Sequence, residues 1–301
     1  MTLASPTPPR AAVLLTLVSS ICATATSLTT LFWAGAFPSP VGESGFNGAL
    51  AEARGWSLVT AAVTLPLLAG ALAAARKGSH SGYLAWLGVL AYLIYTYLEL
   101  AVSPPFTALY LPYIVAFACA IPALVIGVSA LDARALAAAL GDDVPRRSIA
   151  SFAFVTGALL SLAWLKPIVA QTLAASFEWP AGLAAIGHVV HALDLGLQVP
   201  LGIATGVLLL RRKPGGVVLS GILLTNSVCM GLALTAMVVS SALAAGRNPI
   251  EAAPFALLPA VATALAVRFV HAIELATGSA RTRLLSQAPG LHGGQRGSDP
   301  S

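Results

Sequence analysis

Residues 57–77 decide the fold: their sequence is SLVTAAVTLPLLAGALAAARK, an apolar run that ends in two basic residues. A helix needs about 20 mostly apolar residues to cross the hydrocarbon of a bilayer. This stretch supplies that length without a charged side chain before Arg76 and Lys77. It therefore predicts a membrane-spanning helix followed by a basic loop.

The same pattern recurs along all 301 residues, of which 57% are hydrophobic and 9% charged, against about 25% charged in an ordinary soluble domain. The expected fold class is an all-α, polytopic membrane helix bundle. Its domains would be a short N-terminus (1–10), one transmembrane domain (11–276) and a disordered tail rich in Gly, Ser, Gln and Pro (277–301). The apolar runs predict eight spans at 11–36, 57–75, 82–102, 107–131, 149–173, 187–210, 215–245 and 252–274.

The basic residues indicate the orientation of these spans, because cytoplasmic loops of membrane proteins are enriched in Lys and Arg. Eight spans place both termini on one side, and twelve of the sixteen basic residues fall there, whereas only Arg54 and Arg247 fall on the other. We therefore expect both termini to be cytoplasmic. The twelve are Arg10, Arg76, Lys77, Arg134, Arg146, Arg147, Arg211, Arg212, Lys213, Arg281, Arg283 and Arg296.

The first apolar run is longer than the 7 to 15 residues, roughly, of a signal-peptide core. We expect it to remain as the first span. Between the fourth and fifth spans, residues 135–140 followed by Gly141 predict a short surface helix that stops at the glycine.

A faint internal echo links the two halves of the chain. Gly82, Leu84 and Leu87 follow the basic pair at 76–77, and Gly216, Leu219 and Leu223 follow the pair at 212–213. A parallel repeat of four spans plus four is geometrically allowed. Chance similarity between apolar spans is the simpler explanation.

Three charged residues interrupt the apolar segments: Glu99, Lys166 and Asp194. Each would cost roughly 2.5 to 3.5 kcal/mol in the membrane if unpaired. By their distance from the nearest span end, all three lie in the outer third of the bilayer. The sequence therefore predicts that Lys166 pairs with Asp194 or Glu99.

Polar neighbours surround these charges in the third and sixth spans. Tyr92 and Tyr95 precede Glu99 at helical spacing and can donate hydrogen bonds to a carboxylate. In the sixth span, a helical wheel gathers five polar side chains into one stripe, and a nearby proline frees a backbone carbonyl. Such a stripe should face other helices or a wet cavity. Its members are His188, His191, Asp194, Gln198 and Thr205.

Two stretches, Tyr92–Glu99 with Tyr110–Tyr113 and Asp194–Pro200 with Leu210–Gly215, resemble a group of uncharacterised bacterial eight-helix multi-pass membrane proteins. The resemblance covers about a quarter of the chain. It implies an architecture without an established activity. That group has an asparagine after the third span, where this chain has Ser103-Pro104-Pro105.

Three functions fit these residues. The first is a transporter or permease in which Glu99, Lys166, Asp194, Gln198, Tyr92 and Tyr95 form an outward-facing site for a small solute or protons. The second is a metal-dependent membrane enzyme, with His188, His191 and Asp194 as ligands. The third is a structural or sensory subunit whose polar network only fixes helix packing.

The transporter hypothesis implies a non-enzymatic protein of the inner (plasma) membrane whose partners are the bilayer and a small molecule or ion. No cofactor is expected, because the chain has neither a P-loop nor a CxxCH motif. Nucleic acid is not expected as a partner either, since the basic residues flank spans and do not form one stripe.

Overall fold

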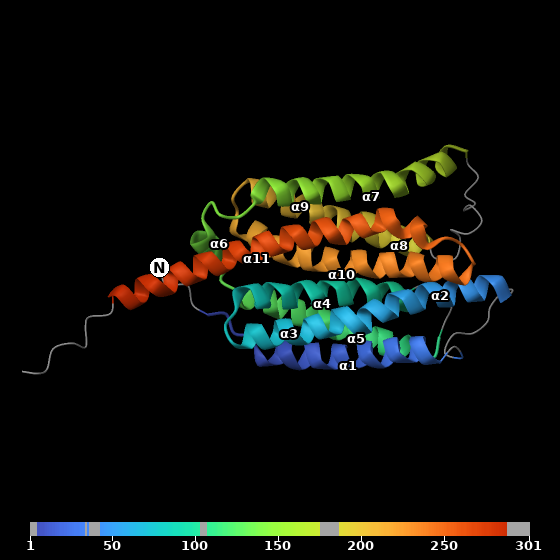
Figure 1. Cartoon of the computed structure of the whole chain (residues 1–301), viewed down its shortest axis with the longest axis horizontal. Helices are drawn as coiled ribbons and strands as arrows, with labels where there is room; N and C mark the ends of the chain where they lie inside the picture. The colour runs from blue at the N-terminus through green and yellow to red at the C-terminus, as the bar shows by residue number, and fades with distance from the viewer. Residues whose placement is uncertain (1–4, 34, 36–42, 103–106, 175–186, 288–301) are drawn as a thin grey trace, which may run out of the picture.

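The computed structural model describes residues 5–33, 35, 43–102, 107–174 and 187–287, and this part consists of helices joined by turns and loops, without strands. The helices run along one long axis (Figure 1). In chain order they are α1 (Arg10–Phe32), α2 (Glu43–Val59), η2 (Thr60–Thr64), α3 (Leu65–Arg76), α4 (His80–Val102), α5 (Tyr110–Ala130), α6 (Ala133–Leu140), α7 (Arg146–Ala174), α8 (Gly187–Leu193), η3 (Asp194–Gln198), α9 (Val199–Leu210), α10 (Pro214–Ala244), η4 (Pro249–Ala252) and α11 (Ala253–Gln287).

Eight helical segments in the described part are long and apolar enough to cross a membrane. This confirms the predicted class, an all-α bundle of a multi-pass membrane protein. Two of the spans are composite, because α2, η2 and α3 follow one another without a break, as do α8, η3 and α9. The last helix continues to Gln287, into the region expected to be a disordered tail. Beyond it, 288–301 lie outside the described residues.

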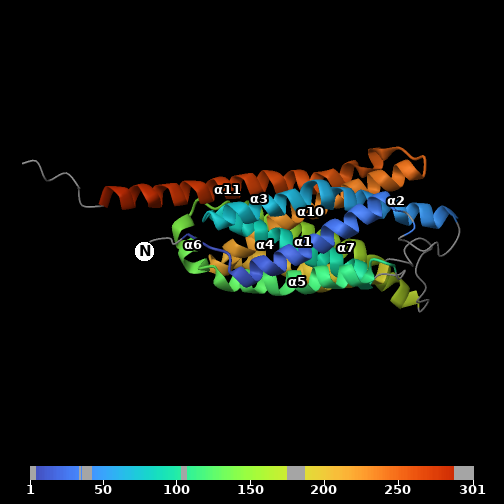
Figure 2. The same cartoon turned by 90° about the horizontal axis from the view of Figure 1, so that it is seen from below.

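The short helix α6 forms as its sequence predicts. Asp132 accepts hydrogen bonds from the backbone N–H groups of Arg134 and Ala135, and Gly141 ends the helix with a positive φ of 49°. The helix lies at the end of the bundle that carries the basic loops (Figure 1), here called the basic end. One end of α11 extends past the bundle on the same side (Figures 1 and 2).

The core of the bundle is built around α4. Tyr83, Trp86, Leu87, Leu90 and Leu93 of this helix are fully buried. The indole of Trp86 donates to Thr16 of α1, and the hydroxyl of Tyr83 donates to the backbone oxygen of Gly127 of α5. Large apolar side chains on the outer helices are exposed, as expected where they face lipid, for example Leu14, Ile21, Leu111, Val125, Leu159 and Leu162.

The two halves of the chain follow the same plan. The segments η2, α3 and α4 begin at 60, 65 and 80, and η3, α9 and α10 begin at 194, 199 and 214, each 134 residues later. The two π-helical segments have five residues each, and α3 and α9 have twelve each. The order and length of the elements therefore repeat, at an offset that aligns Gly82 with Gly216 but not the other positions of the sequence echo.

Several helix contacts repeat as well, although α1 packs extensively on α5 whereas its counterpart α7 barely contacts α11. In the first half α3 and α5 pack on α4 and η2 packs on α1; in the second, α9 and α11 pack on α10 and η3 packs on α7. Between the halves, α4 packs against α10, α2 against α10, and α8 against α4. This arrangement corresponds to a pseudo-two-fold axis between α4 and α10, which run parallel to each other.

Glycines allow the closest contacts between the halves. A Cβ at Gly55 would lie 2.4 Å from the backbone oxygen of Ala236, and one at Gly88 would lie 2.9 Å from that of Ile222. A backbone atom cannot swing aside as a flexible side chain can. These two positions therefore fix how closely the halves approach.

Gly55→Ala should destabilise the bundle by about 1–3 kcal/mol, because the added methyl overpacks a backbone contact. The matched control is Gly70→Ala, since a Cβ at Gly70 meets nothing within 4 Å. Unfolding in detergent measures both variants. Equal losses of stability in the two would contradict the close approach of α2 and α10.

Candidate functional site

Asp194 begins the π-helical segment that interrupts the sixth span. Pro200 has no backbone N–H, and in an α-helix its ring would clash with the carbonyl four residues earlier. The helix widens into a π-helical turn just before Pro200, where the backbone N–H of Val199 donates to the backbone oxygen of Asp194, five residues earlier. Single π-helical turns inside α-helices are frequent at functional sites.

The carboxylate of Asp194 is held by two other spans. Its Oδ1 accepts a hydrogen bond of 2.6 Å from the hydroxyl of Tyr95 on α4, and its Oδ2 accepts one of 2.8 Å from Nε1 of Trp164 on α7. The side chain is buried, with 7% of its surface exposed. Spans three, five and six therefore meet at one acidic side chain, which two neutral donors hold.

His191 forms one wall of this site. It precedes Asp194 by three residues and is buried, with 3% of its surface exposed. The centroid of its ring lies 4.1 Å from that of Trp164, at an interplanar angle of 45°. The same indole thus contacts His191 through its ring and Asp194 through its N–H.

Two further carboxylates lie near Asp194. Glu99 follows Tyr95 by one turn of α4, is half-buried, and lies within electrostatic range of both Asp194 and Glu52. Glu52, on α2, accepts a hydrogen bond of 3.4 Å from the hydroxyl of Ser241. These three residues, here called the acidic cluster, come from three spans. They lie toward the end of the bundle opposite the basic end.

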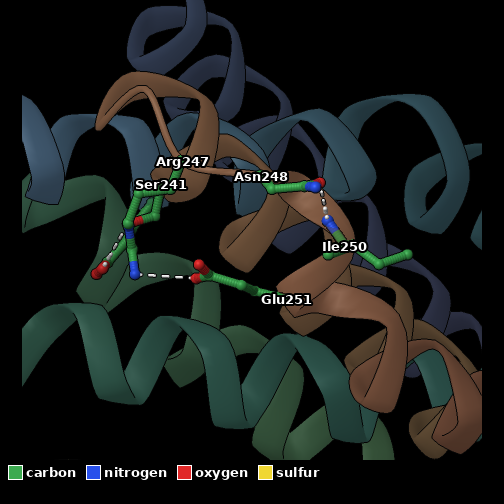
Figure 3. Close-up of polar contacts among 6 residues, drawn as sticks. Ser241, Arg247, Asn248, Ile250 and Glu251 are labelled. Atoms are coloured by element: carbon green, nitrogen blue, oxygen red, sulfur yellow. Dashed lines mark hydrogen bonds and ion pairs between the residues drawn. The ribbon is translucent and has the colours of Figure 1, made fainter.

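Ser241 lies in the last turn of α10, just before the turn that leads to η4 and α11 at this end (Figure 3). In the same turn, Arg247 forms an ion pair of 2.9 Å with Glu251, and Asn248 caps η4 by accepting from the N–H of Ile250. Arg247, the arginine of this turn, is therefore paired with Glu251 and not with a carboxylate of the acidic cluster.

The predicted pairing of Lys166 with Asp194 or Glu99 is wrong. Lys166 is exposed and forms no ion pair with a described residue, while Trp164 occupies the contact with Asp194. Because successive residues turn by about 100° around a helix, a side chain two positions after Trp164 points about 200° away from it. Lys166 therefore faces outward, where a long side chain can extend to the membrane surface.

Tyr92 and Tyr95, expected to share one site, contact different halves. The hydroxyl of Tyr92 lies 2.7 Å from that of Thr60 in η2, and its ring stacks on Trp56 at 6.1 Å. Tyr95 alone of the two reaches Asp194. In the sixth span Gln198 is half-buried at the end of η3, while Thr205 is buried and bonds to its own helix.

Buried polar groups continue from Tyr92 between α4, η2 and α10. The hydroxyl oxygens of Thr64 and Thr96 and the Oδ1 of Asn226 are buried and make no hydrogen bond of good geometry with a described residue, although Thr64 lies beside the thiol of Cys229 and Thr96 beside the hydroxyl of Tyr92. Buried polar groups are nearly always satisfied, by protein or by ordered water. These three can therefore bind water within the bundle.

A metal site of His188, His191 and Asp194 gains no support within the described part of the chain. No group of three His, Cys, Asp or Glu side chains is arranged there to hold a metal ion. The side chain of His188 lies outside the described residues. The set of three ligands therefore stays a prediction.

Trp164 and Glu52 are the site residues that sequence reasoning missed. A tryptophan in the middle of an apolar span carries an N–H that needs a partner, and this could have indicated Trp164. Glu52 precedes the predicted start of the second span at 57, so it fell outside the predicted spans. The observed span begins at Leu50.

Comparisons with known proteins add no assignment: no protein-family model, curated protein or solved structure matches the chain.

The hydrogen bond between Tyr95 and Asp194 should appear as an energetic coupling. Tyr95→Phe should cost about 1–3 kcal/mol in the wild type, because it leaves a buried acceptor unsatisfied, and much less once Asp194→Ala has removed the carboxylate. Unfolding in detergent measures the stability of the wild type, the two single variants and the double variant. Tyr83→Phe is the matched control, because Tyr83 bonds to the backbone of Gly127; equal coupling of both tyrosines to Asp194 would contradict the contact.

Proposed function

We propose that this membrane protein is a transporter or permease in which Asp194 binds a small solute or protons. The observation that carries the proposal is a buried carboxylate at the start of a helix interruption. A charge inside a membrane is costly, and where one occurs it commonly marks an ion, proton or substrate pathway. Asp194 has that position and contacts both halves of the chain.

The plan of the two halves supports this function. In many transporters the binding site lies between two structural repeats, at helices interrupted in corresponding positions. Here η2 and η3 occupy corresponding positions, and each is followed two residues later by a proline, Pro66 or Pro200. Asp194 lies on one interruption, and Tyr92 connects α4 to the other.

A polar route extends from this site toward the basic end. It comprises Tyr92 with Thr60, and the buried polar atoms of Thr96, Thr64 and Asn226. Hydroxyls and water can pass protons by exchanging hydrogen bonds, whereas an apolar core cannot. A route of this kind would connect the acidic cluster to the opposite side.

The positive-inside rule assigns the basic end to the cytoplasm of an inner (plasma) membrane. The acidic cluster would then face the outer side, where Asp194 lies about 10 Å below the start of its span at a rise of 1.5 Å per residue. Gln198 lies one turn deeper than Asp194. It is the best position at which to test whether water reaches the site from outside.

A cysteine at Gln198 should react with a membrane-impermeant thiol reagent added from outside to a variant whose Cys22, Cys119 and Cys229 are replaced by alanine. The matched control is Leu197→Cys, since Leu197 is 42% exposed on the bundle surface and would face lipid. Mass spectrometry measures the labelled fraction. Asp143→Cys, at the basic end, should be labelled only from the cytoplasmic side.

Protection of the cysteine at Gln198 from both sides would contradict the proposal and favour a network that only fixes helix packing. Labelling at Leu197 equal to that at Gln198 would also contradict it, because the reagent would then report exposure of the whole helix. Fast labelling at Gln198, slowed by a bound solute, is the result that the transport function predicts.

A further inference from the structure

The basic end carries a hollow of about 360 Å³ between α6, α7 and the start of α10. Arg134, Arg146 and Arg212 line it, with Asp142 as the acidic residue among the lining side chains. The charges that face the hollow therefore have a positive sum. The residues come from three separate segments, so the fold gathers them.

Two helix starts reinforce this positive charge. Helix α7 begins at Arg146 and α10 begins at Pro214, and both residues line the hollow. Helix N-termini attract anions through their free N–H groups and the helix dipole. In α10 the N-cap residue, Lys213, offers no side-chain hydrogen bond to that end.

The backbone of Arg212 indicates that its side chain is needed here. Its φ is 55°, and it is the only non-glycine residue with a positive φ in the described part. The corresponding position of the first half, 134 residues earlier, is Gly78, with a φ of 85°. Each ends its twelve-residue helix with the same hydrogen bond, Ser79 N–H to Ala74 in one half and Lys213 N–H to Leu208 in the other.

A glycine adopts this conformation at no steric cost, whereas an arginine is disfavoured there. The ion pair of Arg212 with Asp142, at 2.7 Å, does not account for the arginine, because both side chains are largely exposed and such pairs contribute little to stability. The positive-inside rule explains basic residues in this loop, but Arg211 and Lys213 supply them without strain. A ligand in the hollow would account for an arginine at the strained position 212.

Donor groups remain available in the hollow. The Nη2 of Arg146 donates to the backbone oxygen of Gly141 at 2.6 Å, and no described residue accepts a hydrogen bond from its Nη1. Arg212 uses Nη1 for Asp142. Guanidinium groups bind phosphate oxygens with two parallel N–H bonds.

We propose that this hollow binds the phosphate of an anionic lipid headgroup. Its walls are the first residues of two membrane spans, so it lies at the level where headgroups are found. Basic pockets between spans on the cytoplasmic side are suited to anionic headgroups. The inference is independent of the transport function, because the hollow and the acidic cluster lie at opposite ends of the bundle.

The test is native mass spectrometry of the full chain, equilibrated in turn with phosphatidylglycerol, phosphatidylcholine and inorganic phosphate. The wild type should retain phosphatidylglycerol at least about tenfold more tightly than phosphatidylcholine. Arg212→Gly and Arg146→Gln should each bind phosphatidylglycerol about tenfold more weakly. A tenfold change in affinity corresponds to about 1.4 kcal/mol, roughly the contribution of one charge-assisted hydrogen bond. Arg211→Gln, next to Arg212 but outside the lining, is the matched control.

Thermal unfolding without added lipid distinguishes a lost ligand from a lost fold. Arg212→Gly should be at least as stable as the wild type, because glycine removes the strained φ. Unchanged lipid retention in Arg212→Gly, or an equal loss in Arg211→Gln, would overturn the site. Retention or stabilisation by inorganic phosphate equal to that by phosphatidylglycerol would overturn the assignment to lipid.

Discussion

The hydrogen bonds that hold Asp194 are the interaction on which the arrangement of the second half depends. The sixth span has to bury an acidic side chain, and it does so where Pro200 already prevents a regular α-helix. Tyr95 and Trp164 satisfy the two carboxylate oxygens from different spans. Each fixes a rotation: α4 must turn Tyr95 toward the second half, and α7 must turn Trp164 inward. Helix α4 can turn Tyr95 toward the second half because it is the central helix of the bundle.

The two halves share a plan but differ chemically at corresponding positions. At the offset of 134 residues, Asp194 corresponds to Thr60 and Tyr95 to Cys229. The first half therefore has a neutral hydroxyl at its helix interruption, where the second half has an acid. At the basic end the second half again carries the charge, here a positive one: Gly78 is a simple helix terminator, whereas Arg212 adds a charge at the cost of backbone strain. Repeated architecture supplies the scaffold, and the two proposals rest on residues at which the halves depart from the repeat.

The sequence predicts those features that depend on one helix alone. The eight spans follow from the length of the apolar runs, and α6 follows from its N-cap Asp132 and its terminator Gly141. Depth in the membrane could be predicted as well, which is why Asp194 and Glu99 were assigned to one level. Rotation could not be predicted, because the direction in which Trp164 or Lys166 points depends on how α7 packs. The helical wheel that placed the polar side chains of the sixth span in one stripe assumed a regular α-helix with 100° per residue. The π-helical turn at Asp194–Gln198 rotates the residues after it relative to those before it. Pro200 indicated a helix interruption in the sixth span. The corresponding interruption before Pro66 was recognised only when the structure showed that the two halves match.

The most direct measurement of the central claim is the infrared absorption of the Asp194 carboxyl group in proteoliposomes as the external pH is varied. If Asp194 is a functional acid reached by water, the carbonyl band of its protonated form should appear and disappear with external pH. That band should shift in D₂O and be absent from Asp194→Asn, with Glu99→Gln identifying the contribution of the neighbouring acid. A difference spectrum between wild type and Asp194→Asn that does not change with pH or with D₂O would contradict the account. Asp194 would then be a sealed structural group.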